Sequence, residues 1–233
     1  MKNFMSFISY FIPLKKLRRK FRALYVNGNR IKYRHNNKII IHLPNGKTIM
    51  NPHRIPELKV NFKGKNSTIE LFYPITFKHC EFSLINDCVF TVHKSRLLYT
   101  KIYAYNESVV FIDENTSIGG VRVHMLNEKG TSLKIGKDVV LSYDIEIYTT
   151  DTHPIFDMNG KCINNKKSCV SIGDHCWIGA SCVLLKGTNI PENCILGHSS
   201  VCASKLSQPN SIYAGNPCKC VKSDITWRGG TID

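Results

Sequence analysis

The sequence predicts an all-β chain in which short strands form triangular coils that stack on one another. Two observations carry this prediction: apolar anchor residues recur every six positions, and a small residue follows each of the later anchors by four positions. An α-helix repeats at about 3.6 residues and a strand at about two, so neither explains a period of six. The anchors are Ile112, Ile118, Ile135, Leu141, Ile147, Ile172, Ile178, Leu184, Ile190 and Leu196, and the small residues are Cys176, Cys182, Thr188, Cys194 and Ser200.

A short strand followed by a tight corner fits this spacing. Three such units close one coil of about 18 residues, in which the branched anchor fills the interior and the small residue packs beside it. Glycine, asparagine or aspartate is expected at the corners, where the chain turns sharply. One coil cannot bury its apolar face alone, and several coils must therefore stack.

The patterns along the chain change from one segment to the next. Short β-branched runs next to turn signals, such as "KIIIH" before "PNGK", indicate strands in the N-terminal part. We expect a basic arm and short strands over residues 1–60, coils over 61–206 that are irregular to about 132 and regular from 133, an extruded loop over 154–168, and a C-terminal tail over 207–233.

Charge and composition narrow the choice of partner. The 233 residues carry 32 Lys and Arg against 17 Asp and Glu, a formal net charge of +15. Such a surplus favours an anionic partner, such as a phosphorylated cofactor, an acidic glycan or an anionic membrane surface, or it is simply a solvated basic face. Nucleic acid is not expected, because the basic residues show no aromatic-interleaved or helix-turn-helix pattern.

The cysteines and the N-terminus predict a cytoplasmic protein. Cys176, Cys182 and Cys194, three of the ten cysteines, fall on the six-residue lattice, which favours packed thiols over a disulfide framework. The apolar run near the N-terminus is shorter than the roughly 20 residues that span a bilayer, and no small-residue cleavage site follows it. Residues 1–25 are either a helix docked on the domain or a helix that rests on anionic lipid at the inner face of the membrane.

One histidine stands out against the lattice. His153 comes 18 residues after Ile135, in the position of an apolar anchor, and the lattice then stops until Ile172. Pro154 helps to end the strand, because proline cannot donate to the hydrogen-bond ladder. His153 is either a histidine at a loop hinge, bonded to the chain, or a catalytic group.

The stretch 133–222 resembles the hexapeptide-repeat acyltransferases, and most closely the maltose/galactoside-type and polysaccharide O-acetyltransferases. The resemblance rests on the lattice, on the His153-Pro154 pair and on "YAGNPCKCVK" at 213–222, which is similar to the sequence that follows the last coil in that family. It implies a left-handed parallel β-helix, acetyl-CoA as co-substrate, a homotrimer with active sites between subunits, and a glycan or sugar acceptor.

The resemblance also implies roles for individual residues. His153 would be the general base that takes the proton of the acceptor hydroxyl, and the backbone N–H of Ala180 would stabilise the oxyanion. The residues that would contact acetyl-CoA are Ala180, His198, Ser204, Lys205, Lys219 and Lys222. The substrate-binding candidates are Asp144, Asp151 and Trp177, although the aspartates also fit turn caps and Trp177 also fits a subunit contact.

The expected function is therefore acetyl-CoA-dependent O-acetylation of a cell-surface polysaccharide or its sugar precursor. The alternatives are N-acetylation of a nucleotide-linked amino sugar, acetylation of an antibiotic, a metal-dependent hydratase and a non-enzymatic scaffold. A hydratase of this fold needs three histidines from adjacent coils, two of them close in sequence. His153, His175 and His198 are instead 22 and 23 residues apart, so no metal is expected.

Overall fold

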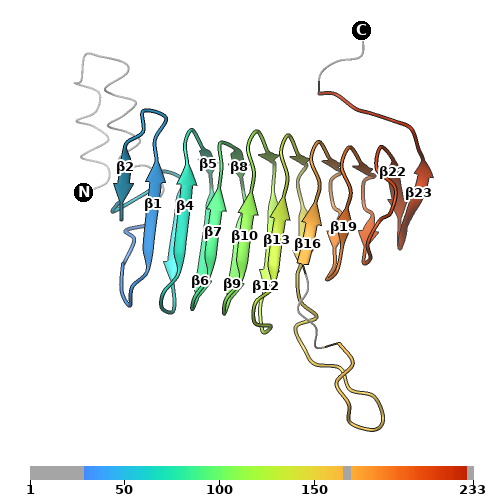
Figure 1. Cartoon of the computed structure of the whole chain (residues 1–233), viewed down its shortest axis with the longest axis horizontal. Coiled ribbons are helices and arrows are strands. Elements are labelled where there is room, and N and C mark those ends of the chain that lie inside the picture. The colour runs from blue at the N-terminus through green and yellow to red at the C-terminus, as the bar shows by residue number, and fades with distance from the viewer. Residues whose placement is uncertain (1–28, 165–168, 230–233) are drawn as a thin grey trace.

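The computed structural model describes residues 29–164 and 169–229, and within these ranges the chain forms a parallel β-solenoid with three faces (Figure 1). Each face is a sheet of short strands, and strands of successive coils pair in parallel within it. Along the chain, a coil crosses sheet one, then sheet two, then sheet three. The all-β stack of coils that the sequence predicts is confirmed.

The strands are short in all three sheets. Sheet one contains β1 (Lys38–His42), β2 (Thr48–Met50), β4 (Thr68–Phe72), β7 (Val89–Val92), β10 (Val109–Ile112), β13 (Ser132–Ile135), β16 (Cys169–Ile172) and β19 (Asn189–Ile190). Sheet two contains β5 (Thr76–Lys78), β8 (Arg96–Leu98), β11 (Ser117–Ile118), β14 (Val140–Leu141), β17 (Trp177–Ile178), β20 (Ile195–Leu196), β22 (Ile212–Gly215) and β23 (Cys218–Lys222). Sheet three contains β3 (Leu58–Phe62), β6 (Cys80–Ile85), β9 (Lys101–Tyr105), β12 (Val121–Met125), β15 (Ile145–Tyr148), β18 (Val183–Leu184) and β21 (Val201–Cys202).

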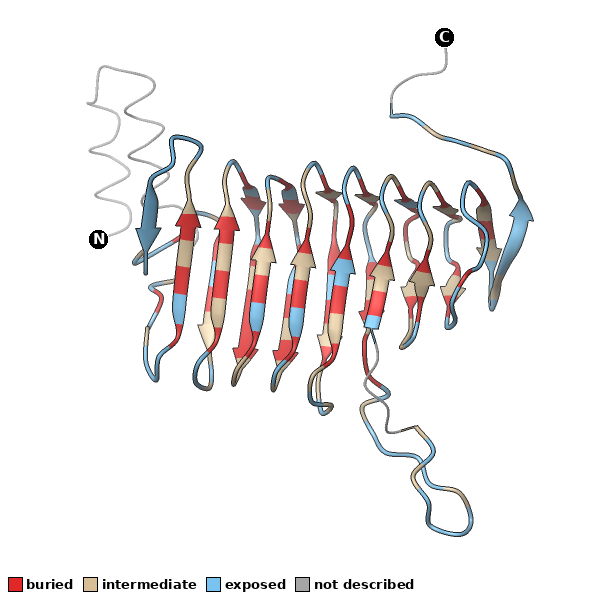
Figure 2. Cartoon of the chain, in the orientation of Figure 1, coloured by how far each residue is buried: buried red, intermediate tan, exposed pale blue. Residues whose placement is uncertain are grey.

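The predicted anchors form the core. In sheet one, Ile135 pairs with Ile112 on one side and with Ile172 on the other, and Ile172 pairs with Ile190. All of these side chains are at most 2% exposed. Figure 2 shows the result as buried positions that alternate with intermediate or exposed ones along the strands. Stacking thus removes each coil's apolar row from water, which is the main stabilising contribution in such a fold.

The small residues four positions after the anchors are also buried. Cys176, Cys182 and Cys194 are fully enclosed, as the lattice predicts. The thiol of Cys176 donates to the carbonyl of Pro191 at 3.0 Å, one coil further on. Burial raises the pKa of Cys176 to about 12, which keeps this thiol protonated at neutral pH.

The corners use the left-handed backbone region. His175, Ser181, Asn193 and Ser199 each lie three residues after an anchor and have φ between 50° and 57°. Three of these four, His175, Ser181 and Ser199, are histidine or serine, outside the set expected at corners. Gly173, directly after an anchor, has a different reason to be glycine: a Cβ there would lie 2.7 Å from the backbone nitrogen of Glu192 in the next coil. Its small size permits the coils to approach each other.

The strand pairing begins earlier than the expected start at residue 61. β1 pairs in parallel with β4, and β3 pairs in parallel with β6, so both already belong to the solenoid. These coils escape the six-residue pattern because their strands and corners are longer, while Ile39 and Leu58 are as fully buried as the later anchors. At the other end, β22 continues sheet two and β23 folds back antiparallel to it.

A long loop leaves the solenoid between β15 and β16, as the sequence predicts (Figure 1). It joins sheet three to sheet one and projects away from the stack at their shared corner. The predicted arm at residues 1–25 lies outside the described residues.

Candidate active site

The loop is anchored before it reaches His153. Thr149 and Thr150 are still buried, and the hydroxyl of Thr150 donates to the carbonyl of Leu126 in the preceding coil at 2.9 Å. Beyond them the chain turns outward at Thr152, which has a φ of 66°. The polar residues after this point therefore lie outside the core.

His153 is exposed at the root of the loop. Its backbone N–H donates to the carbonyl of Asp151 at 2.7 Å, and its own carbonyl accepts from the side-chain amide of Asn164 at 3.0 Å. The residue lines a hollow of about 170 Å³ together with Glu128 and Pro154. An imidazole at this position is open to an acceptor molecule from outside the chain.

The expectation that His153 takes the position of an apolar anchor is wrong. Ile172 pairs with Ile135 and fills that interior position, because the whole loop is inserted between the two strands. The physical reason is that an imidazole in the apolar interior would lack a hydrogen-bond partner, which is costly. His153 interrupts the lattice by leaving the stack.

Four of the other predicted residues gather at the corner between sheets two and three. Asp144 and His198 are exposed there, and Ala180 is buried beside them. The carboxylate of Asp144 accepts from the hydroxyl of Ser181 at 3.1 Å. Trp177, in β17, is 41% exposed and donates its ring N–H to the hydroxyl of Ser142 at 3.4 Å.

A larger hollow adjoins this corner on its N-terminal side. It has a volume of about 540 Å³ and is lined in part by Asp144, by the exposed rings of Tyr99 and Tyr143 and by the cationic side chains of Lys101 and Arg122. Neither tyrosine was singled out by the sequence pattern. The corner therefore offers room for a polar molecule beside Asp144.

The basic candidates lie at the C-terminal end of the solenoid. Lys205 is exposed and bridges to Asn189 at the edge of sheet one, directly after Ser204. Lys219 and Lys222 are exposed on β23, at the edge of sheet two. Within the described ranges, none of these three lysines forms an ion pair. Their charges are available to an anion.

One chain does not bring all of these residues together. His153 and Asp151 lie at the corner between sheets three and one, whereas Trp177, Ala180 and His198 belong to sheet two and the corner that follows it. His175 occupies the remaining corner, between sheets one and two, so the three histidines lie on three different corners. The catalytic candidate is thus separated from most of the binding candidates.

No protein-family model matches the chain, but single proteins do. It is 32% identical over 117 residues to the polysialic acid O-acetyltransferase of Neisseria meningitidis, covering 50% of this chain and 53% of that protein. It is 27% identical over 136 residues to the polysialic acid O-acetyltransferase of Escherichia coli O1:K1, covering 58% and 43%. The galactoside O-acetyltransferase of Escherichia coli K12 is 28% identical over 91 residues, covering 39% and 44%.

Solved structures of polysialic acid O-acetyltransferases are similar to this chain as well. The polySia-specific acetyltransferase NeuO superposes with a TM-score of 0.68 and 25% identity, covering 88% of this chain and 87% of that one. The chain resembles the hexapeptide-repeat acetyltransferases. Its solenoid is the left-handed parallel β-helix that this resemblance implies, and the polysialic acid O-acetyltransferase OatWY has the same fold, with a TM-score of 0.64 at 21% identity over 88% and 92% of the two chains.

The sequence similarity to the curated polysialic acid O-acetyltransferases covers 50% and 58% of this chain. The chain spans about half the length of the curated relatives that it matches.

Within residues 29–164 and 169–229, no helix is long and apolar enough to cross a bilayer.

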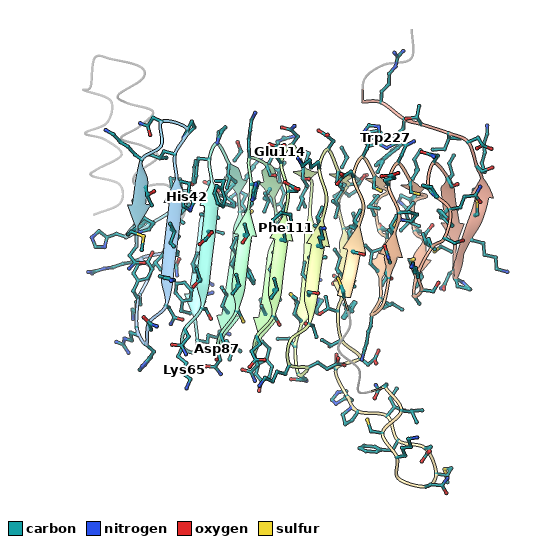
Figure 3. All side chains as sticks on the ribbon, in the orientation of Figure 1. His42, Lys65, Asp87, Phe111, Glu114 and Trp227 are labelled. Atoms are coloured by element: carbon teal, nitrogen blue, oxygen red, sulfur yellow. The ribbon has the colours of Figure 1, made fainter. Side chains whose placement is uncertain are left out.

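Sequence reasoning missed two residues that contact the candidate site residues or lie near them. The first is Lys186, which lies at the loop root and bonds to Glu128 and Asp151. The second is Trp227 of the C-terminal tail, which is labelled in Figure 3. Its ring stacks on His175 at 4.7 Å between centroids and lies 6.0 Å from the ring of Trp177. A second tryptophan beyond the last coil was the available signal.

Proposed function

We propose that this protein is an acetyl-CoA-dependent O-acetyltransferase that acts on a hydroxyl of a cell-surface polysaccharide or its sugar precursor. The observation that carries the proposal is the similarity to the polysialic acid O-acetyltransferase of Neisseria meningitidis. The exposed position of His153 beside a hollow supports it, since a base must be within reach of the hydroxyl. N-acetylation of an amino sugar and acetylation of an antibiotic remain the alternatives within this chemistry.

The proposed reaction needs one proton transfer and one stabilised charge. Bound acetyl-CoA supplies an acetyl group on a thioester. Nε2 or Nδ1 of His153 takes the hydroxyl proton as the acceptor oxygen bonds to the acetyl carbon, and the imidazolium then returns that proton to the departing thiolate as the C–S bond breaks. We assign stabilisation of the oxyanion to the backbone N–H of Ala180, since the side chain of Ala180 has no hydroxyl to offer. Trp177, Asp144 and Asp151 are proposed to hold the acceptor.

The cofactor-binding proposal rests on charge. Coenzyme A carries a pyrophosphate and a further phosphate, and exposed lysines without ion-pair partners suit such a ligand. Lys205, Lys219 and Lys222 meet this description, and we assign them to the phosphates together with Ser204. His198, at the same corner as Ala180, is assigned to the pantetheine end. Figure 1 places β23 at the C-terminal end of the stack, away from the root of the loop.

We further propose that the protein is a homotrimer. The separation of His153 from Trp177 within one chain supports this, because a neighbouring solenoid that packs alongside can bring its own loop corner to the Trp177 corner. A cytoplasmic location, with the basic arm of residues 1–25 in contact with an anionic membrane, is part of the same proposal.

The test is an acetylation assay on candidate glycans. The protein is incubated with acetyl-CoA and polysialic acid, a neutral polysaccharide, a nucleotide-linked amino sugar or an aminoglycoside, and the products are analysed by mass spectrometry. We expect the mass of one or more acetyl groups to be added to a polysaccharide at oxygen, and mild base to remove it. Acetylation at nitrogen alone, which withstands mild base, would contradict O-transfer.

A further inference from the structure

Lys186 is a nearly enclosed cation at the corner between sheets three and one. Its side chain is 12% exposed, and that of its partner Glu128 is 16% exposed. The ammonium lies 3.0 and 3.1 Å from the two carboxylate oxygens of Glu128, 3.0 Å from Oδ2 of Asp151 and 2.7 Å from the carbonyl of Asn164. Burial lowers the pKa of Lys186, but the two carboxylates raise it by more, and the group therefore stays charged at neutral pH.

The three partners come from three different segments. Glu128 belongs to the corner of the preceding coil, Asp151 to the outgoing arm of the loop and Asn164 to its returning arm. Lys186 itself belongs to the corner after β18, in the following coil. One ammonium therefore ties both arms of the loop to the stack.

The ties continue to His153 through Asn164. The side-chain amide of Asn164 donates to Oδ2 of Asp151 at 2.9 Å and to the carbonyl of His153 at 3.0 Å. Its oxygen accepts from the backbone N–H of Ile155 at 2.7 Å. Together with the bond from the N–H of His153 to Asp151, the backbone is held on both sides of the imidazole while the ring stays exposed.

A buried ion pair is a costly way to stabilise a fold, since apolar residues of similar size often do as well. The two arms already pair with each other further out, where the N–H of Ile163 donates to the carbonyl of Ile155 at 2.8 Å. What the charge adds here is a fixed link between this paired loop and the corners of the stack. We propose that Lys186 is a positioning residue that holds His153 in place through Asp151 and Asn164, and this rests on the proposed role of His153 as the base.

The test compares Lys186→Met with Lys137→Met. Methionine keeps the length of the stem and removes the charge, whereas Lys137 pairs with Glu114 on an exposed corner and has no link to the loop. We expect Lys186→Met to lower kcat about 10- to 100-fold with little change in the KM for acetyl-CoA, because misplacing a catalytic group acts on the chemical step. Lys186→Arg should recover most of the loss, and Lys137→Met should behave as the unaltered protein.

A second measurement needs no activity. Hydrogen exchange followed by mass spectrometry should show faster exchange at residues 151–155 in Lys186→Met and unchanged exchange in Lys137→Met. Equal kcat for the two methionine variants, or a loss of kcat with unaltered exchange at the loop, would overturn the proposal. If Lys186→Met does not fold, Asn164→Ala, which leaves the stack intact, is expected to show the same two effects. Hydrogen exchange also separates the positioning role of Lys186 from the role of His153 as the base. If His153 is not the base, the faster exchange at the loop in Lys186→Met is still expected.

Discussion

At the scale of single residues, His153 and Lys186 lie at the same corner in opposite environments. The imidazole is exposed at the loop root, while the ammonium is enclosed by carboxylates and a carbonyl. A group that exchanges protons with a substrate needs access, and a group that fixes a chain segment needs bonds on all sides. The exposed His153 therefore suits a role in the reaction, and the enclosed Lys186 suits a role in supporting the loop.

The first prediction concerns the base. His153→Ala should lower kcat at least about 100-fold, because a positioned base typically contributes this much or more. The KM for acetyl-CoA should change little, since the imidazole acts on the acceptor hydroxyl. Steady-state kinetics with the accepted glycan measures both. His53→Ala, at an exposed position near the N-terminal coils, is the matched control, and near-normal turnover in His153→Ala would remove the site assignment.

The second prediction concerns the phosphates of coenzyme A. Lys219→Ala should raise the KM for acetyl-CoA several-fold with a smaller effect on kcat, because the loss removes binding that is equal in the ground and transition states. Higher salt should weaken acetyl-CoA binding less in the variant than in the unaltered protein. Lys47→Ala, on an exposed turn, serves as the control. A fall in kcat at constant KM would assign Lys219 to another role.

The site was only partly predictable at this scale. His153 is visible because it breaks a pattern, whereas Glu128 and Lys186, 58 residues apart, meet only after the coils stack across an inserted loop. Counting in steps of six residues no longer identifies equivalent positions once such a loop is inserted. The partners of an individual side chain are therefore beyond what spacing can show.

At the scale of elements, the buried thiols form part of the corners of the last coils. Cys176, Cys182 and Cys194 are enclosed, while Cys169, at the start of β16, is exposed. At pH 8, iodoacetamide should label Cys169 and leave the three corner thiols unmodified in the native protein, because alkylation needs an accessible thiolate. Mass mapping of the labelled peptides measures this. Labelling of all four at similar rates would show that the corners open readily.

The same burial predicts a loss of stability at alkaline pH. The pKa of Cys176 is raised to about 12 in the folded chain, whereas a thiol in an unfolded chain ionises near about 8.5. The protonated thiol contributes fully to stability below its pKa in the unfolded chain, and this contribution is lost as the pH rises toward 12. Above about pH 9 the free energy of unfolding should fall by about 1.4 kcal/mol per pH unit from this group.

Urea denaturation between pH 8 and 10.5 gives that slope. Cys176→Ala has no thiol to ionise and should show a shallower decline over the same range. If the free energy of unfolding has the same pH dependence in both proteins, the thiol of Cys176 is not enclosed in the folded chain.

The coils were predictable where anchors and corners follow one short period. From Ile172 to Leu196 every expected anchor is buried and every expected small residue is fully enclosed. The sequence pattern did not show that coils begin before residue 61, where β1 and β3 have five residues each. Longer strands add residues between anchors, and the period becomes variable while the pairing stays continuous.

At the scale of the whole molecule, the separated corners predict assembly. A homotrimer would place His153 of one chain near Trp177 of its neighbour. Light scattering at working concentration should therefore give about three times 26.5 kDa. Mixing His153→Ala with Trp177→Ala protein should restore part of the activity, because some mixed interfaces then carry both intact residues. A mass of one chain would contradict the shared site.

The two antiparallel strands at the ends of the sheets have a consequence for how copies of the molecule can meet. β2 covers the free side of β1 in sheet one, and β23, which carries Lys219 and Lys222, covers the free side of β22 in sheet two. An uncovered parallel edge invites another chain to extend the sheet, and an antiparallel cap opposes that, above all at β23, where the cap is charged. Fibrils that grow end to end along the solenoid axis are thereby disfavoured, and contacts through the sides are left as the route to a closed particle.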